Sequence, residues 1–395
     1  MSTAIQTGTT VRLPGRDGSL RHHVMGPASE YAQSFSPPVT RIAYAAAHVV
    51  ADPLADIGPI PGTAIDWDAT LAYRRALWSL GLRVAEAMDT AQRGMGLDWA
   101  TSQELIRRSI AEAKAVGGQV ASGAGTDHLA PGPGLSLDAI VDAYEEQCGF
   151  VEGEGGRIIL MASRALAAAA TSPDDYHQVY DRVLSQIREP VIIHWLGDMF
   201  DPALAGYWGS HDLDEAMTSC LSMLEAHADK IDGIKISLLD KDREIAMRRR
   251  LPAGIRMYTG DDFDYSELIE GDAQGYSDAL LGIFDAIAPA AGAALAAFDA
   301  GDLDRYRAIF EPTVPLSRHI FAAPTRFYKT GVVFMAWLQG HQPHFHMVNG
   351  QQNARSVVHL AELFALADDA RLFHDPDEAA RRMRLFLSLA GVEQL

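Results

Sequence analysis

The chain has 395 residues and a formal net charge of −19, from 33 lysines and arginines against 52 aspartates and glutamates. An acidic surface of this kind disfavours nucleic acid and anionic membranes as partners. The two cysteines, Cys148 and Cys220, show no metal or redox spacing, so a disulfide framework is not expected and a reducing compartment is favoured. We therefore expect a cytoplasmic protein whose partner is a small-molecule substrate.

The sequence predicts neither a secretory signal at residues 1–15 nor a membrane span in its longest apolar run. Residues 1–15 lack the apolar core of a secretory signal. The alanine-rich run at 286–298 is too short to span a bilayer and predicts a packed helix. Residues 1–38 are polar and contain glycine and proline, so we interpret them as an N-terminal extension that includes a short hairpin.

From residue 39 on, short apolar runs alternate with amphipathic segments of helical length, which is typical of parallel βα units. Strands are expected at 41–50, 82–88, 119–123, 157–162, 190–195, 231–237, 254–258 and 275–280. Helices are expected at 67–80, 101–116, 136–148, from 172 onward, and at 212–228 and 241–250. After residue 284 only helical patterns appear, including 302–321, 326–339, 354–367 and 375–390.

Eight strands joined by helical crossovers predict an α/β protein with a closed (β/α)8 or TIM barrel over residues 39–300. A C-terminal helical region over residues 301–395 is expected to pack on the barrel. The alternative is a doubly wound open sheet. A nucleotide-binding fold of that kind has a glycine-rich motif after the first strand, and residues 51–53 (Ala-Asp-Pro) contain no glycine.

In such barrels, catalytic residues lie at the C-terminal ends of the strands. Lys235 is unusual because it stands inside an apolar strand, in Ile-Asp-Gly-Ile-Lys-Ile-Ser. Alternation along the strand puts Gly233, Lys235 and Ser237 on one face and the isoleucines on the other, so Lys235 should point into the barrel mouth. Loss of hydration would lower its pKa and make a neutral amine available as a nucleophile. The plainer interpretation is a lysine that neutralises nearby carboxylates.

Other polar side chains follow the strand ends and are candidate site residues. His194 and Asp89 are candidates for catalysis beside Lys235. The candidates for substrate binding are Thr90, Gln92, Trp195, Ser237, Asp261 and Asp278. Asp261 and Asp262 have a second interpretation, because at least one of them is expected to cap the helix that leads to Leu268.

Several short motifs resemble those of the dihydrodipicolinate synthase and N-acetylneuraminate lyase family. Residues 232–235 (Asp-Gly-Ile-Lys) look like the sixth-strand motif, and residues 259–262 (Thr-Gly-Asp-Asp) resemble its seventh-strand Ser-Gly-Asp-Asp. Residues 190–194 (Pro-Val-Ile-Ile-His) are similar to the fifth strand, and residues 89–92 (Asp-Thr-Ala-Gln) to the second-strand Thr-Thr-Gly-Glu. The order of these motifs on the expected strands spans about residues 40–340.

The resemblance implies a class I aldolase or lyase in which Lys235 forms a Schiff base, with no cofactor and no bound metal. It also implies a homo-oligomer, a dimer or tetramer. The family's fifth-strand tyrosine, which relays protons, is His194 here. Asp89 replaces the first threonine of the carboxylate-binding pair and would repel a bound carboxylate. We therefore expect a keto acid or carbohydrate-derived carbonyl substrate other than simple pyruvate.

Two other functions remain open from the sequence. The first is a metal-dependent barrel isomerase or hydrolase of sugar-like substrates, with Glu86, His48, His194 and Asp278 as ligands. The second is a sugar-binding regulator on a barrel that has lost catalysis. The histidines of one late loop could also bind a metal, although a solvated loop is the favoured interpretation; they are His341, His344 and His346.

Overall fold

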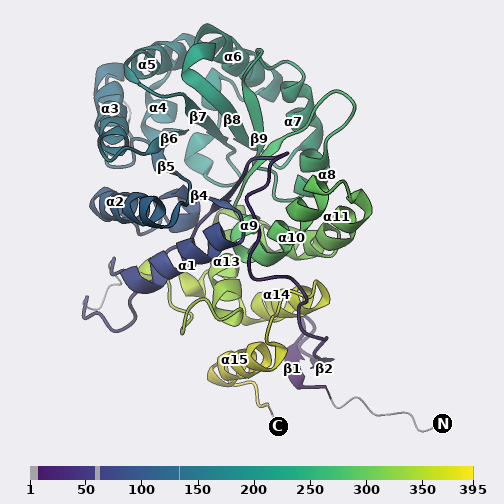
Figure 1. The fold of residues 1–395 in the computed structure, drawn as a ribbon. Helices are drawn as coiled ribbons and strands as arrows, with labels where there is room; N and C mark the ends of the chain where they lie inside the picture. The colour runs from purple at the N-terminus through teal and green to yellow at the C-terminus, as the bar shows by residue number, and fades with distance from the viewer. Residues whose placement is uncertain (1–7, 58–62, 133, 395) are drawn as a thin grey trace, which may run out of the picture.

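Eight parallel strands close into one barrel (Figure 1). The computed structural model describes residues 8–57, 63–132 and 134–394. Around the barrel the strands follow the order β10-β3-β4-β5-β6-β7-β8-β9, so each strand is hydrogen-bonded to its neighbour in sequence and β10 closes on β3. The (β/α)8 prediction is therefore confirmed. The strands are β3 Ala43–Ala46, β4 Arg83–Glu86, β5 Val120–Ala124, β6 Arg157–Met161, β7 Val191–Leu196, β8 Ile231–Ser237, β9 Arg256–Thr259 and β10 Asp278–Leu281.

Strand alternation divides the core into an inner and an outer part. On β8, Ile234 and Ile236 pack outward with the helices. Gly233 faces inward, where an added Cβ would lie 2.6 Å from the ring of Tyr258. A separate inner cluster fills the barrel with alanines and larger apolar or aromatic side chains: Tyr44, Ala46, Ala85, Met88, Ala121, Ile159, Ile192, Tyr258 and Leu280. This filled centre confines any site to the mouth.

Helices cover the outside of the barrel. They are α1 Trp67–Ser79, α2 Trp99–Val116, α3 Leu137–Gly153, α4 Arg164–Ala169, α5 Pro173–Gln186, α6 Leu213–Ala226, α7 Lys241–Arg248, α8 Tyr265–Glu270, α9 Ile283–Ala286 and α10 Ala288–Asp299. Helix α5 begins with a capping box between Ser172 and Asp175 and has proline in its first turn. Short 3-10 turns connect the elements: η1 Asp89–Ala91, η2 Pro202–Leu204, η3 Tyr207–Gly209, η4 Ala228–Lys230, η5 Thr325–Phe327 and η6 Val348–Asn353.

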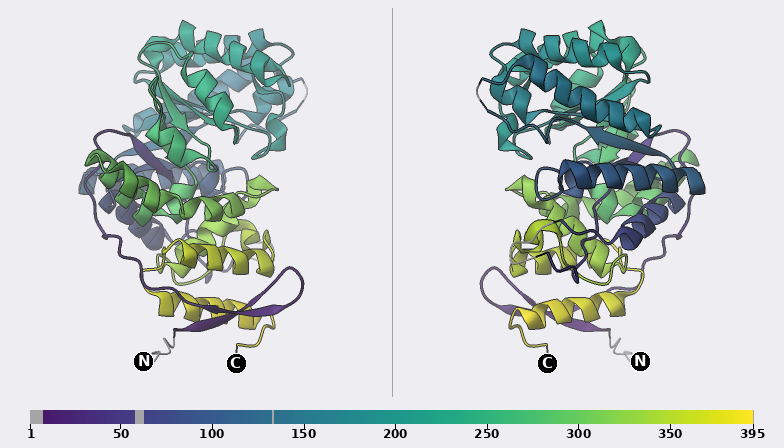
Figure 2. Two further views of the ribbon diagram at one scale, coloured as in Figure 1. Left: turned by 90° about the vertical axis from the view of Figure 1, so that its right-hand side faces the viewer. Right: turned by 90° about the vertical axis from the view of Figure 1, so that its left-hand side faces the viewer.

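The C-terminal helices form a second unit against one end of the barrel (Figure 2). They are α11 Leu303–Phe310, α12 Thr313–Ile320, α13 Tyr328–Leu338, α14 Val357–Asp369 and α15 Pro376–Leu389. The single helix expected at 302–321 is two helices, because Pro312 lies between them and has no N–H to continue the first. Among the described residues, no helix has the length and apolar character needed to cross a membrane.

The N-terminal extension contains the expected hairpin. Strands β1 Thr10–Pro14 and β2 Leu20–Val24 pair antiparallel. The hairpin packs on α14 and α15, far from the barrel helices α3 to α6 in both views of Figure 2. The first and last parts of the described chain therefore meet on the C-terminal helices.

Candidate active site

Lys235 occupies the inside of the barrel near its mouth. It stands on β8 opposite His194 of β7 in the strand register, and only 5% of its surface is exposed. Burial lowers the pKa of Lys235, and the negative charges of Asp89 and Asp262 oppose that shift. Gly260 leaves space for the side chain, since an added Cβ would lie 2.7 Å from Lys235 Cε. The placement agrees with the inward orientation expected from alternation.

Asp89 is the charged centre of the mouth. It begins η1, directly after β4. Its Oδ2 accepts a hydrogen bond of 2.7 Å from the Tyr328 hydroxyl and lies 3.6 Å from Lys329 Nζ. Burial alone would raise the pKa of Asp89, but the positive charges of Lys329 and Lys235 lower it to about 2. The carboxylate is therefore ionised at every physiological pH.

Thr90 and Tyr328 extend this carboxylate into a chain of hydrogen bonds. The two hydroxyls are 2.7 Å apart. Ionised Asp89 can only accept, so Tyr328 donates its single proton to Asp89 and must accept from Thr90. The sequence placed Thr90 at the site, and the partner that fixes its direction comes from α13 of the C-terminal unit.

His194 is fully buried beside Lys235. Its Nε2 lies 3.4 Å from Ser237 Oγ, and its Nδ1 has no hydrogen-bond partner among the described residues. Burial and the nearby Lys235 charge hold the pKa of His194 well below its usual value, and Asp89 opposes them. The ring of His194 is therefore neutral at physiological pH.

The two aspartates that follow β9 have different tasks. Asp261 Oδ1 accepts from the backbone N–H groups of Phe263 and Asp264 in the turn before α8, and burial raises its pKa to about 6. The N-cap of α8 is Asp264, without a side-chain hydrogen bond, so the expectation that Asp261 or Asp262 caps this helix is wrong. Asp262 Oδ1 accepts from Ile283 N at 2.8 Å, and burial raises its pKa to about 8. Asp262, whose charge acts on Lys235, is the acid of this pair that faces the lysine.

Gln92 has a connecting position at the edge of the mouth. It adopts a left-handed backbone with φ 68°, and its Nε2 donates to Val348 O at 2.9 Å. Its Oε1 is buried and has no partner within the described chain. Gln92 thereby ties the loop after β4 to η6 of the C-terminal unit.

The structure separates two predicted substrate-binding residues from the mouth. Trp195 alternates with His194 and so faces outward, where its ring lies 6.3 Å from that of Trp208. Asp278 is the first residue of β10, because this strand spans 278–281 and not 275–280. It accepts from Ile42 N at 2.6 Å and pairs with Arg256, at the N-terminal end of the barrel. Both expectations are corrected.

The four side chains expected to share a metal do not converge. Glu86 turns outward to Arg74, and both side chains are fully buried in that ion pair. His48 binds Asp285 at 2.9 Å and Gln342 Oε1 at 3.1 Å. His194 lies in the mouth and Asp278 at the opposite end of the barrel. Within residues 8–57, 63–132 and 134–394, no three His, Cys, Asp or Glu side chains are grouped to hold an ion.

The late-loop histidines do not act as one cluster either. His341 is partly buried against Tyr73, with ring centroids 4.8 Å apart, and burial lowers the pKa of His341 to about 4. His344 and His346 lie beside each other, and His344 Nδ1 accepts from His346 N at 3.2 Å. The solvated-loop interpretation therefore fits the exposed His346, whereas His341 and His344 are partly buried.

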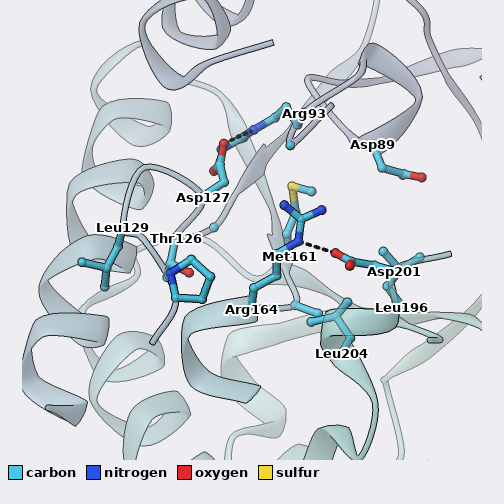
Figure 3. Close-up of a pocket in the computed structure, with 14 residues that line it drawn as sticks. Asp89, Arg93, Thr126, Asp127, Leu129, Met161, Arg164, Leu196, Asp201 and Leu204 are labelled. Atoms are coloured by element: carbon cyan, nitrogen blue, oxygen red, sulfur yellow. Dashed lines mark hydrogen bonds and ion pairs between the residues drawn. The ribbon is translucent and has the colours of Figure 1, made fainter. Parts of the chain in front are cut away.

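A cavity of about 120 Å³ opens beside Asp89 (Figure 3). Residues that follow β4, β5, β6 and β7 line it, including Arg93, Asp127, Arg164 and Asp201. Lys235 does not line this cavity; Asp89 is the residue shared between them. A substrate in the cavity would therefore approach Lys235 past the Asp89 carboxylate.

Several residues of the mouth were not among the predicted ones. Tyr328 and Lys329 lie in a helical pattern with no local sign of a site, and only the packing of α13 brings them to Asp89. Arg164 and Asp262 also lie at this end of the barrel and are not among the predicted site residues. A lysine in an otherwise apolar helix makes Lys329 unusual in the sequence, but this pattern does not indicate that α13 reaches Asp89.

Comparison with known proteins agrees with this fold. Residues 11–392 match the family model described as a protein of unknown function (DUF993), and the chain belongs to that family. None of the curated protein sequences matches the chain.

The chain also resembles solved dihydrodipicolinate synthases. The Bacillus anthracis enzyme is 16% identical, with a TM-score of 0.58, over 82% of this chain and 98% of that one. The Aquifex aeolicus enzyme is 14% identical, with a TM-score of 0.57, over 90% and 99%. The Bacteroides thetaiotaomicron enzyme is 12% identical, with a TM-score of 0.58, over 79% and 92%. The likeness establishes a shared fold.

Proposed function

We propose that this chain is a Schiff-base-forming lyase or aldolase that acts on a small carbonyl compound. One observation carries the proposal: Lys235 is buried inside the barrel mouth, opposite His194 and between the charges of Asp89 and Asp262. The fold it shares with dihydrodipicolinate synthases adds support.

The environment of Lys235 favours a neutral amine. Burial is the largest effect on the pKa of Lys235 and lowers it, whereas the charges of Asp89 and Asp262 oppose the shift. Neutral Nζ attacks the carbonyl carbon, and the carbonyl oxygen takes one proton from the amine and one from solvent and leaves as water, giving a cationic iminium. Electrons of a broken C–C or C–H bond flow into this iminium as an enamine. Protonation and hydrolysis then return the free lysine and release the product.

Proton transfer is assigned to Asp89. Its carboxylate is ionised and lies where the cavity meets Lys235, so it can accept the proton of a substrate hydroxyl. Thr90 and Tyr328 hold its orientation through their directed hydrogen bonds. His194, buried and neutral, serves as a hydrogen-bonding neighbour of the iminium together with Ser237.

The test is reductive trapping with mass spectrometry. The enzyme is incubated with candidate keto acids and keto-sugars plus borohydride, and the modified peptide is mapped. We expect added mass on Lys235, absent in Lys235→Met and unchanged in Lys241→Met, which alters an exposed lysine paired with Glu267. Mapping is essential because Lys329 is a second buried lysine beside the same carboxylate. Mass on Lys329 alone, or turnover that survives in Lys235→Met, would contradict the proposal.

A further inference from the structure

The cavity beside Asp89 is lined by two arginines that are used very differently. The donors of Arg93 are satisfied within the protein. Nη1 donates to Gly123 O at 2.8 Å, Nη2 donates to Gln147 Oε1 at 2.7 Å, and the guanidinium pairs with Asp127. Its side chain is only 1% exposed. Such a residue holds loops together and has no donor left for a ligand.

Arg164, the first residue of α4, is the opposite case. Among the described residues its one hydrogen bond is from Nε to Asp201, on η2's N-terminal side. Its side chain is 37% exposed and is among those that line the cavity. Figure 3 shows the guanidinium rising into the space between the lining residues, with Nε toward Asp201. Nη1 and Nη2 are thus a free pair of parallel donors on an anchored side chain.

The backbone at Gly94 leaves space for the guanidinium of Arg164. Gly94 adopts φ +73°, and an added Cβ there would lie 2.6 Å from Arg164 Nη1 and 2.9 Å from Nη2. The planar group therefore rests against the glycine backbone on one side and is held by Asp201 at Nε. A side chain fixed in two ways loses little rotamer entropy when it binds a ligand.

Each acid of the cavity lining has partners within the protein. Asp127 is paired with Arg93, Asp201 accepts from Arg164 Nε and from Ala203 N, and Asp89 contacts Lys329 and Tyr328. Asp201 balances the charge of Arg164 but engages only its Nε, so Nη1 and Nη2 have no hydrogen-bond partner among the described residues. Burial lowers the pKa of Lys329, and the positive charge of Arg164 lowers it further.

We propose that Arg164 forms a binding site for an oxyanion, so that the substrate carries a carboxylate or phosphate group at a distance from the carbonyl that reaches Lys235. This inference rests on the proposed Schiff-base function and names its substrate class. The free Nη1 and Nη2 suit two oxygens of one oxyanion, in the two-pronged geometry that distinguishes arginine from lysine. In this arrangement the oxyanion of the substrate binds Arg164, and its carbonyl group extends past Asp89 toward Lys235. Asp89 lines the cavity and also interacts with the charge of Lys235.

The experiment compares trapping at Lys235 for matched aldehydes. Succinic semialdehyde and butyraldehyde both have four carbons and differ in a carboxylate; glyceraldehyde 3-phosphate and glyceraldehyde differ in a phosphate. In the unmodified protein we expect the charged member to half-saturate labelling at a concentration roughly tenfold or more below the neutral one, the size of a charge-assisted hydrogen-bonded contact. The pair with the larger ratio identifies the oxyanion as carboxylate or phosphate.

Variants locate the site. Arg164→Met and Gly94→Ala should abolish the ratio while butyraldehyde labelling persists, which also reports an intact fold. Arg164→Lys should keep only part of the ratio. Arg188→Met changes an arginine whose side chain is 81% exposed, and should leave the labelling by both the charged and the neutral aldehydes unchanged. Equal half-saturation in the unmodified protein, or a ratio retained in Arg164→Met, would overturn the oxyanion site. Failure of labelling with every aldehyde would instead overturn the Schiff-base function.

Discussion

At the scale of single residues, the mouth is organised around one carboxylate held by a distant helix. Asp89 follows β4, whereas the hydroxyl and the ammonium group that contact it come from Tyr328 and Lys329 at the start of α13. These contacts do more than orient Asp89, because an opposite charge nearby favours the ionised form. Tyr328 and Lys329 are therefore positioning residues that keep Asp89 ionised and fix its orientation.

Removing Lys329 should change the titration of Asp89. In Lys329→Met the pKa of Asp89 should rise from about 2 by roughly 1–3 units, the usual effect of a neighbouring opposite charge. Tyr328→Phe should give a smaller rise, since it removes a hydrogen bond and no charge. Carbon-13 NMR of labelled aspartate, assigned with Asp89→Asn, measures this directly. An Asp89 resonance that stays fully ionised at pH 4 in Lys329→Met, as in the control Lys241→Met, would show that Lys329 has no such effect.

A second buried acid lies outside the site and affects stability. Glu244 of α7 accepts hydrogen bonds from Thr259 at 2.9 Å and Ser277 at 2.6 Å, and burial raises its pKa from 4.5 to about 8. The folded state thus binds this proton more tightly than the unfolded state does. Stability from this group is fully present below pH 4.5 and is lost as the pH rises toward and through 8.

Glu244→Gln should therefore stabilise the protein at pH 9 by on the order of 1–3 kcal/mol and have little effect near pH 5. Glutamine keeps the shape and cannot ionise. Chemical denaturation at the two pH values tests the difference. A variant that is equally destabilised at both would mean that Glu244 is ionised in the native protein and that its charge is needed.

At the scale of elements, the site depends on the close approach of β8 and the turn that follows β9. An added Cβ at Gly260 would lie 2.3 Å from Ser237 Oγ and 2.5 Å from Ile236 O, as well as against Lys235. Gly260→Ala should therefore displace Lys235, slow trapping by at least about tenfold and destabilise the fold by about 1–3 kcal/mol. Gly149→Ala is the matched control, because open space surrounds that glycine in α3 and alanine favours helix. Normal trapping rates in Gly260→Ala would show that the lysine does not need this space.

The same elements explain what the sequence could predict. Every barrel strand lies within or near its expected range, because apolar runs between helical patterns are a local signal. Alternation on β8 correctly placed Lys235 inside, and the same rule on β7 excludes Trp195, which its position at the end of the fifth strand had suggested. Asp278 was misplaced because β10 has only four residues and begins later than expected. Tyr328 and Lys329 depend on long-range packing of α13, for which a single sequence gives no local signal.

At the scale of the whole molecule, the two ends of the chain brace the unit that supplies Tyr328 and Lys329. Arg12 and Gln394 exchange two hydrogen bonds, of 3.1 and 3.0 Å, and Arg384 donates to Thr10 O. Leu13 of β1 is completely buried within the hairpin's packing on α14 and α15, and these helices in turn contact α13. The hairpin is thus connected to the barrel mouth through three helices.

This arrangement predicts that damage to the hairpin reaches the active site. Leu13→Ala should destabilise the protein by about 2–4 kcal/mol, the usual effect of truncating a buried leucine. The variant should also lose trapping at Lys235 at a lower denaturant concentration than the unmodified chain. Leu20→Ala on β2 removes the same atoms from a side chain that is 44% exposed and should be nearly neutral in both assays. Unfolding followed by circular dichroism, with trapping measured in parallel, compares the two. If Leu13→Ala unfolds the C-terminal helices while trapping at Lys235 persists, the barrel mouth works without its brace and the contacts of Asp89 with α13 are dispensable.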